Sequence, residues 1–170
     1  MKSKENIVFL GMMGSGKSSI GSLVAKKLKL NFVDIDNEIE TQTNMSIKKI
    51  FEIKGENYFR KMEESITLKC LKFDNVIISL GGGGFVNKNI RKEVLKNHLS
   101  FWLNWKNEIL LNRIKNSSKR PLASRASDSE IMNLIKKRVN IYSKALFEIK
   151  CDNLTKNQII KKVLNIYETY

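Results

Sequence analysis

The chain of 170 residues contains one proline and two cysteines, and it lacks a long uninterrupted apolar segment. A membrane-spanning helix needs roughly 18 or more consecutive apolar residues, so we expect no membrane partner. The two cysteines, Cys70 and Cys151, are too few and too far apart for a disulfide framework or a zinc site. A single proline excludes collagen-like and proline-rich chains. The composition therefore indicates a globular protein in a reducing compartment, and we expect it in the cytoplasm.

Negative charge is also scarce, because the chain has 17 acidic residues but 31 Lys and Arg residues, which gives a formal net charge of +14. Such a balance is compatible with a nucleotide-dependent protein that binds nucleic acid. The positive residues are scattered, however, and no block of like charges or run of base-stacking aromatic residues accompanies them. We therefore expect no nucleic-acid partner, and we expect the positive field to favour small anionic ligands.

The spacing of apolar residues predicts short buried strands that alternate with amphipathic helices. The expected strands cover residues 6–10, 32–36, 76–80, 101–103 and 147–150. The expected helices cover residues 17–28, 46–54, 56–73, 87–96, 106–114, 128–142 and 155–170. This alternation is typical of a parallel α/β sheet covered by helices on both faces, so we expect one domain over residues 1–170.

A polar stretch at residues 115–129 shows neither helical nor strand periodicity, and it contains Arg120 and the single proline, Pro121. Long internal loops of this kind are commonly functional, for example as lids over a binding site. A lid closes over a bound ligand and excludes water from the site. We therefore expect a mobile lid at approximately residues 115–129.

Residues 11–18, with the sequence GMMGSGKS, match the phosphate-binding pattern G-x-x-x-x-G-K-[ST] at every position. The match follows a predicted strand and precedes a predicted helix, which is the context that the pattern requires. The N–H groups of the loop and the N-terminus of the following helix can surround phosphate oxygens. Lys17 can reach the β- and γ-phosphates, and the hydroxyl of Ser18 is suited to Mg²⁺. The pattern predicts binding of ATP or GTP but does not identify the phosphate acceptor.

Two carboxylates, Asp34 and Asp36, close the second predicted strand, whereas the third strand ends in glycines without a carboxylate. In an extended chain, alternate residues share one face, so we expect both side chains on the ligand side of the sheet. One would order the water shell of the metal ion, and the other would bind the acceptor hydroxyl. Alternatively, the two aspartates serve as a helix cap and a turn residue.

Six segments of the chain together resemble the shikimate kinases. In chain order they are Gly11 to Ser18, Asp34-x-Asp36, Gly55-Glu56-x-x-Phe59-Arg60, Glu63-Glu64, Ser79-Leu80-Gly81-Gly82-Gly83 and Arg120-Pro121-Leu122. The resemblance extends over essentially the whole chain. It implies a three-layer α/β/α P-loop kinase fold with a five-stranded parallel sheet and a mobile lid, similar to the nucleoside monophosphate kinases. It also implies ATP-dependent phosphorylation of the 3-hydroxyl of shikimate, with Mg²⁺, on the route to chorismate and the aromatic amino acids.

The same resemblance implies a role for individual residues. The nucleotide would be bound by Gly11, Met12, Met13, Gly14, Ser15, Gly16, Lys17, Ser18, Ser19, Arg113 and Arg120. Shikimate would be bound by Asp36, Arg60, Gly81, Gly82, Gly83 and Arg138. Lys17, Asp36 and Arg120 would be catalytic, whereas Ser18 and Asp34 would hold Mg²⁺. The chemistry of the residue types agrees, because a guanidinium binds a carboxylate through two parallel hydrogen bonds.

Two departures from the family pattern affect the expected nucleotide site. Residue 123 is alanine where a second leucine is common, and the turn at residues 152–156 lacks the arginine or proline that many relatives carry near adenine. Arg113 is therefore the only residue that we assign to the adenine side, while Trp102 and Trp105 are expected to pack in the core.

The alternative function is another small-acceptor kinase, for example one that acts on gluconate or a nucleoside monophosphate. We expect a monomer.

Overall fold

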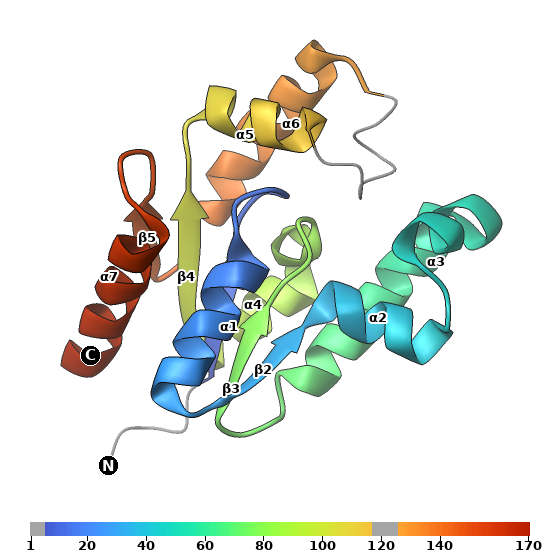
Figure 1. Cartoon of the computed structure of the whole chain (residues 1–170). Coiled ribbons are helices and arrows are strands. Elements are labelled where there is room, and N and C mark those ends of the chain that lie inside the picture. The colour runs from blue at the N-terminus through green and yellow to red at the C-terminus, as the bar shows by residue number, and fades with distance from the viewer. Residues whose placement is uncertain (1–5, 117–125) are drawn as a thin grey trace.

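The computed structural model describes residues 6–116 and 126–170, and within them five parallel strands form one sheet (Figure 1). The strands are β1 (Ile7–Leu10), β2 (Asn31–Asp34), β3 (Val76–Ser79), β4 (Leu99–Asn104) and β5 (Phe147–Lys150). The helices are α1 (Lys17–Leu28), α2 (Ile35–Thr43), α3 (Ile47–Cys70), α4 (Lys88–Asn97), α5 (Asn107–Lys115), α6 (Asp128–Tyr142) and α7 (Lys156–Thr169), with a short 3₁₀ turn η1 (Gly84–Val86). The strand order is β2-β3-β1-β4-β5, so the phosphate-binding strand lies in the middle of the sheet.

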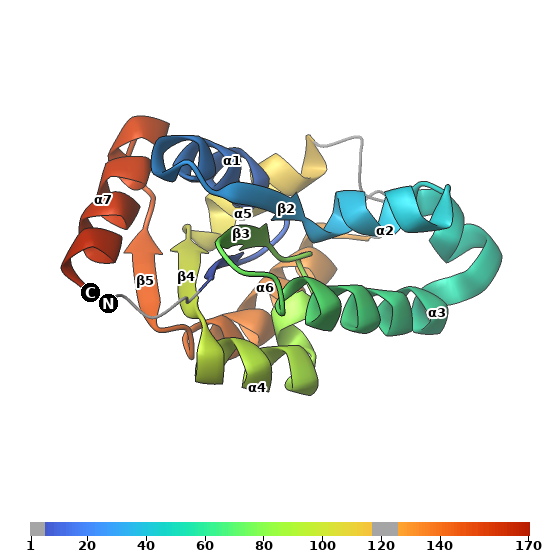
Figure 2. The ribbon, with the colours of Figure 1, turned by 90° about the horizontal axis from the view of Figure 1, so that it is seen from below.

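Helices cover both faces of the sheet, as the alternation of elements predicts. Figure 2 shows α1 and α7 on one face, and α3, α4 and α6 on the other. Successive residues of the fully buried strand β1 point to opposite faces, because Ile7 and Phe9 pack under α1 and α7 whereas Val8 and Leu10 belong to the other core. The expected fold is therefore confirmed. No helix within residues 6–116 and 126–170 is long and apolar enough to cross a membrane.

The chain after β2 differs from the expectation, because β2 ends at Asp34 and helix α2 begins at once. Asp34 is the N-cap of this helix, and its carboxylate accepts a hydrogen bond from the backbone N–H of Asn37 at 3.2 Å. Asp36 lies in the first turn of α2 rather than in the strand. The prediction that the two aspartates share one face of an extended chain is thus wrong, since residues two apart on a helix point in nearly opposite directions.

Helix α3 contains the break that the sequence predicts. Ser46 caps its N-terminus by accepting a hydrogen bond from the N–H of Lys49 at 3.2 Å. Gly55 then adopts φ 80° and ψ 171° inside the helix, a conformation that glycine reaches without the steric penalty of a side chain. The helix ends at Cys70, three residues before the expected end.

The polar stretch at 115–129 is helical at both of its ends. Lys115 is the last residue of α5, and α6 begins at Asp128 after a capping box formed by Ser127 and Glu130. The expected lid residue Arg120 lies outside the described residues.

Candidate active site

The phosphate loop joins β1 to α1 and adopts the conformation that its glycines allow. Gly14 and Gly16 have φ values of 78° and 90°, which residues with a side chain rarely adopt. Gly16 is the N-cap of α1, so the helix N-terminus and its N–H groups face the loop. The structure therefore places the expected nucleotide residues 11–19 in one turn with a preformed anion-binding shape.

Lys17, the first residue of α1, folds back over this loop. Its ammonium group donates hydrogen bonds to the backbone carbonyls of Gly11 and Met12, both at 3.0 Å. The side chain is 5% exposed, so the positive charge is concentrated at the loop. This arrangement can bring a cation to the end of a bound phosphate chain.

Ser18 and Asp34 meet at the edge of the loop nearest β2, where the serine hydroxyl donates a hydrogen bond to the aspartate carboxylate. Both groups offer oxygen atoms, which are the ligands that Mg²⁺ prefers. Among the described residues no cluster of three or more His, Cys, Asp and Glu residues could hold a metal ion. The two oxygens therefore fit an ion that takes most of its ligands from phosphate and water, as Mg²⁺ usually does.

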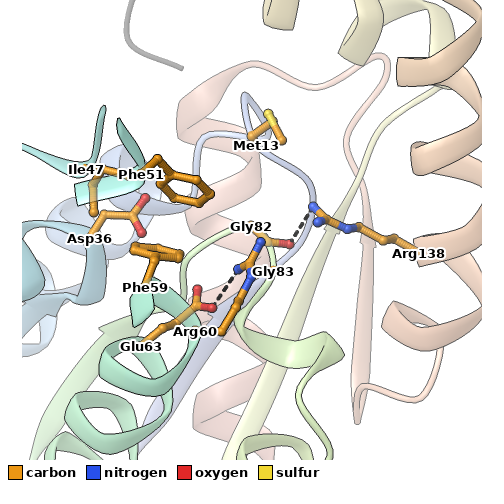
Figure 3. Close-up of a pocket in the computed structure, with 10 residues that line it drawn as sticks. All are labelled: Met13, Asp36, Ile47, Phe51, Phe59, Arg60, Glu63, Gly82, Gly83 and Arg138. Carbon is orange, nitrogen blue, oxygen red and sulfur yellow. Dashed lines mark hydrogen bonds and ion pairs between the residues drawn. The ribbon is translucent and has the colours of Figure 1, made fainter. Parts of the chain in front are cut away.

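A pocket opens beside the loop, between α2, α3 and the glycines after β3 (Figure 3). Its empty volume, which includes open solvent, is about 460 Å³. The lining residues are Met13, Asp36, Ile47, Phe51, Phe59, Arg60, Glu63, Gly82, Gly83 and Arg138. Three charged groups of the predicted acceptor site, Asp36, Arg60 and Arg138, thus reach one cavity from three different helices.

Arg60 is held by two carboxylates of its own helix. Its guanidinium donates to Glu63 at 2.7 Å and to Glu56 at 3.1 and 3.2 Å. Glu63 is 2% exposed, and this burial raises the pKa of its carboxyl group, while Arg60 opposes the shift and Asp36 reinforces it. Glu63 therefore fixes the position of Arg60 at the pocket wall.

The glycines after β3 allow charged side chains to approach the backbone closely. A Cβ atom at Gly81 would lie 2.5 Å from Oε1 of Glu63 and 2.7 Å from Oδ1 of Asp36. A Cβ atom at Gly83 would overlap with the guanidinium of Arg60. The space that side chains would fill at these two positions is thus occupied by the charged groups of the pocket.

Two side chains of α6 bind the backbone of the same glycine segment. Arg138 donates to the carbonyl of Gly82 at 3.1 Å, as the dashed line in Figure 3 marks, and the Tyr142 hydroxyl donates to the same oxygen. Burial raises the pKa of Tyr142, so this hydroxyl remains a donor. Tyr142 is therefore a buried residue that also anchors the pocket wall.

On the opposite side of the phosphate loop, Arg113 of α5 lies on the ring of Trp105, with Cζ 3.8 Å from the ring centroid. Trp102 is buried at 5% exposure, as predicted, and Trp105 is half-buried. The expectation that Trp105 only packs in the core is therefore incomplete, because it also stacks on an arginine.

The family model of shikimate kinase matches residues 13–168 of the chain. The chain belongs to the shikimate kinase family. Among curated relatives, the shikimate kinase of Persephonella marina is 40% identical over 160 residues, which are 94% of this chain and 96% of the relative. The shikimate kinase of Bartonella quintana is 35% identical over 168 residues, which are 98% of this chain and 80% of the relative. Family membership makes the chain a kinase, and thus an enzyme.

Solved structures of the shikimate kinase family have the same fold. The shikimate kinase from Acinetobacter baumannii in complex with shikimate has a TM-score of 0.91 and 27% identity, covering 97% of this chain and 93% of that one. The enzyme from Aquifex aeolicus has a TM-score of 0.83 and 34% identity, with 96% of each chain covered. A deoxyadenosine kinase from M. mycoides, at 16% identity and a TM-score of 0.64, shares the fold alone.

Two residues of the kinase pocket, Ile47 and Phe51, belong to no recognisable motif. Together with Phe59 of the segment Gly55-Glu56-x-x-Phe59-Arg60 they supply its apolar wall, where Phe51 and Phe59 pack with ring centroids 4.7 Å apart. Phe51 is one apolar residue among many in α3, and only the break at Gly55 brings it back over Phe59. The position of Tyr142 beside Arg138 could have been inferred from the sequence, because Tyr142 follows Arg138 by four residues and residues at this spacing share a helix face.

Proposed function

We propose that the chain transfers the γ-phosphoryl group of ATP to the 3-hydroxyl of shikimate, in the route to chorismate. The observation that carries this proposal is the pocket beside the phosphate loop, in which Asp36, Arg60 and Arg138 converge. A molecule with one carboxylate and several hydroxyl groups on a ring matches these charged side chains and the phenyl wall. Family membership supports the same acceptor.

In this proposal the two arginines bind the carboxylate of shikimate. A guanidinium offers parallel donors that match the two oxygens of a carboxylate. Arg60 is already oriented by Glu63 and Glu56, and Arg138 by the carbonyl of Gly82. Because both side chains are ordered before the ligand arrives, binding costs less side-chain entropy.

Asp36 lies on the other side of the pocket from Arg138, as Figure 3 shows. A carboxylate there can accept a hydrogen bond from the attacking hydroxyl and take its proton. The hydroxyl oxygen forms a bond to the γ-phosphorus, the bond from that phosphorus to the β–γ bridging oxygen breaks, and ADP leaves. Lys17 offsets the negative charge on the phosphates during this transfer.

Ser18 and Asp34 would hold Mg²⁺, which neutralises phosphate charge when bound. The resemblance assigns Arg120 to the transferring phosphate, and this role stays a prediction. We also infer that the protein is a cytoplasmic monomer and that it requires neither a membrane nor nucleic acid. Sedimentation of the protein alone would test whether it is a monomer, and sedimentation with nucleic acid would test whether it binds nucleic acid.

An ADP-release assay over a panel of acceptors tests the function. The panel contains shikimate, gluconate, AMP, CMP and no acceptor, each with MgATP. We expect that shikimate is the one acceptor of this panel that raises ADP formation above the rate without acceptor. A shikimate analogue without the carboxylate should be a poor acceptor, because it leaves both arginines without their carboxylate partner. Turnover with gluconate or a nucleoside monophosphate and not with shikimate would contradict the proposal.

A further inference from the structure

The stack of Arg113 on Trp105 lies away from the acceptor pocket and has no part in the mechanism above. The guanidinium carbon is 3.8 Å from the centroid of the indole ring, so no atom fits between the two groups. At this distance the guanidinium is in contact with the ring face, as in a cation–π pair. Trp105 is half-buried and Arg113 is exposed, so the inner partner is fixed and the outer one faces solvent.

Both side chains are also bound to the phosphate loop. The indole N–H of Trp105 donates to the carbonyl of Ser15 at 2.9 Å, and Arg113 donates to the carbonyl of Gly14 at 3.4 Å. Trp105 follows directly after β4 and packs against buried residues of both faces of the sheet. A ring held in this way restricts a long arginine side chain that would otherwise sample many rotamers.

The position of the stack relative to the phosphate loop indicates what it could bind. The loop follows β1, and β1 has β3 on one side and β4 on the other. The acceptor pocket takes the side of β3, where Gly82 and Gly83 line it. Trp105 and Arg113 lie on the other side of the loop, next to β4. The resemblance to the shikimate kinases assigns Arg113 to the adenine side of the nucleotide, so the stack would lie beside the base.

We propose that Trp105 is a positioning residue for the nucleotide, which holds the guanidinium of Arg113 flat so that its outer face stacks on the base of ATP. The proposal rests on the proposed function, since it takes a nucleotide in the phosphate loop as given. Trp105 does not touch the base in this arrangement. It acts through Arg113, because a cation that is already oriented loses less entropy when it binds a π face.

The variant Trp105→Leu tests the proposal, since it removes both the ring face and the N–H group. We expect the KM for ATP and the Kd for ADP to rise about fivefold or more, the range of a partly desolvated cation–π contact. The KM for shikimate should change by less than about twofold, because the acceptor pocket lies on the other side of the loop. The inhibition constant of inorganic tripolyphosphate, which has phosphates but no base, should also stay within about twofold.

Three further variants distinguish an action through Arg113 from a general loss of aromatic packing. Phe147→Leu is the matched control, since Phe147 is another half-buried aromatic residue but belongs to β5 and contacts Phe101 and Tyr170. Trp105→Phe keeps a ring and loses only the N–H group, so its KM for ATP should rise less than that of Trp105→Leu. In an Arg113→Ala background, Trp105→Leu should have no additional effect on the KM for ATP.

Two results would overturn the proposal. An equal rise in the inhibition constant of tripolyphosphate would mean that Trp105 acts through the backbone of the phosphate loop, and additive effects of Trp105→Leu and Arg113→Ala would mean that it does not act through Arg113. Should the leucine variant not fold, Trp105→Met replaces it, because methionine fills irregular space without a π face. The Kd for ADP, measured by calorimetry, needs no turnover. A failure of the proposed function, seen as no ADP release with shikimate, therefore leaves this test intact.

Discussion

Arg60 donates a hydrogen bond to one oxygen of the buried Glu63 carboxylate at 2.7 Å, and the other oxygen of that carboxylate lies against Gly81. Glu63 thus orients Arg60 within helix α3 and also lies next to the segment after β3. The guanidinium of the acceptor pocket is therefore held in position before any ligand binds.

Arg60→Lys keeps the positive charge but loses the planar pair of donors. We expect the KM for shikimate to rise about tenfold or more, because a bidentate charge-assisted contact becomes a single one. The KM for ATP should stay within about twofold, since the residue is separated from the nucleotide side of the loop. Steady-state kinetics with each substrate varied in turn measure both constants.

Arg91→Lys is the matched control, because Arg91 is another hydrogen-bonded arginine near the glycine segment, where it donates to the backbone carbonyls of Phe85 and Val86, but does not line the pocket. It should leave both KM values within about twofold of wild type. Equal weakening of shikimate and ATP by Arg60→Lys would instead indicate a structural role.

The substitution Gly81→Ala adds a Cβ atom that would lie 2.7 Å from Oδ1 of Asp36 and 2.5 Å from Oε1 of Glu63. The two carboxylates must move, so we expect a loss of turnover of about tenfold or more, together with a destabilisation of about 1–3 kcal/mol. Gly84→Ala is the control, because its Cβ would make only ordinary contacts, the nearest at 3.5 Å to Leu80. Assays of kcat measure the loss of turnover, and urea unfolding of both variants measures the destabilisation. Equal effects of Gly81→Ala and Gly84→Ala would contradict the prediction.

Asp34→Asn and Asp36→Asn should have different effects, because the two side chains point to different partners. Asp34 accepts the hydrogen bond of Ser18 beside the phosphate loop, so its loss should raise the Mg²⁺ concentration needed for half-maximal activity. Asp36 lines the acceptor pocket, so its loss should lower kcat by about 10² or more with little change in nucleotide affinity. Magnesium titrations and ADP binding measure the two effects, and exchanged phenotypes would reverse the assignment.

The stability of the protein should depend on pH through Glu63. Burial raises the pKa of this carboxyl group in the folded state above its ordinary value of 4.5. The folded protein therefore keeps the proton where the unfolded chain has released it, and the free energy of unfolding falls as pH rises through that window. Because Glu63→Gln lacks this titration, its stability relative to wild type should increase as pH rises from 4.5 and then level off above the folded-state pKa.

Urea unfolding at several pH values checks this dependence. For Glu64→Gln the stability difference from wild type should change with pH in the opposite direction, because hydrogen bonds from Asn89 and Asn87 lower the pKa of Glu64 below 4.5. That variant should lose stability relative to wild type as pH rises toward 4.5 and show no further change above it. A constant difference between wild type and Glu63→Gln over the whole range would contradict the prediction.

The local features of this protein were determined by the sequence itself. The pattern of residues 11–18 predicts a phosphate loop because glycines and a lysine at that spacing have few other uses between a strand and a helix. Ser46, Ser127 and Thr155 cap their helices, and capping depends on residues within one turn, so their residue types at these positions indicate where the helices begin. Five parallel strands follow from the alternation of apolar runs with helical patterns.

Only the tertiary structure decided how distant residues meet. Helix α2 was not apparent in the sequence, because a helix of nine residues with a capping aspartate resembles the end of a strand followed by a polar turn. The break at Gly55 brings Phe51 against Phe59, Asp36 and Glu63 approach each other at Gly81, and the packing of α5 on the phosphate loop places Arg113 on Trp105. These contacts depend on a backbone break or on packing between elements, so their partners cannot be inferred from spacing along the chain. The contact of Glu63 with Arg60 is different, because residues three apart on a helix are neighbours and their spacing predicts it.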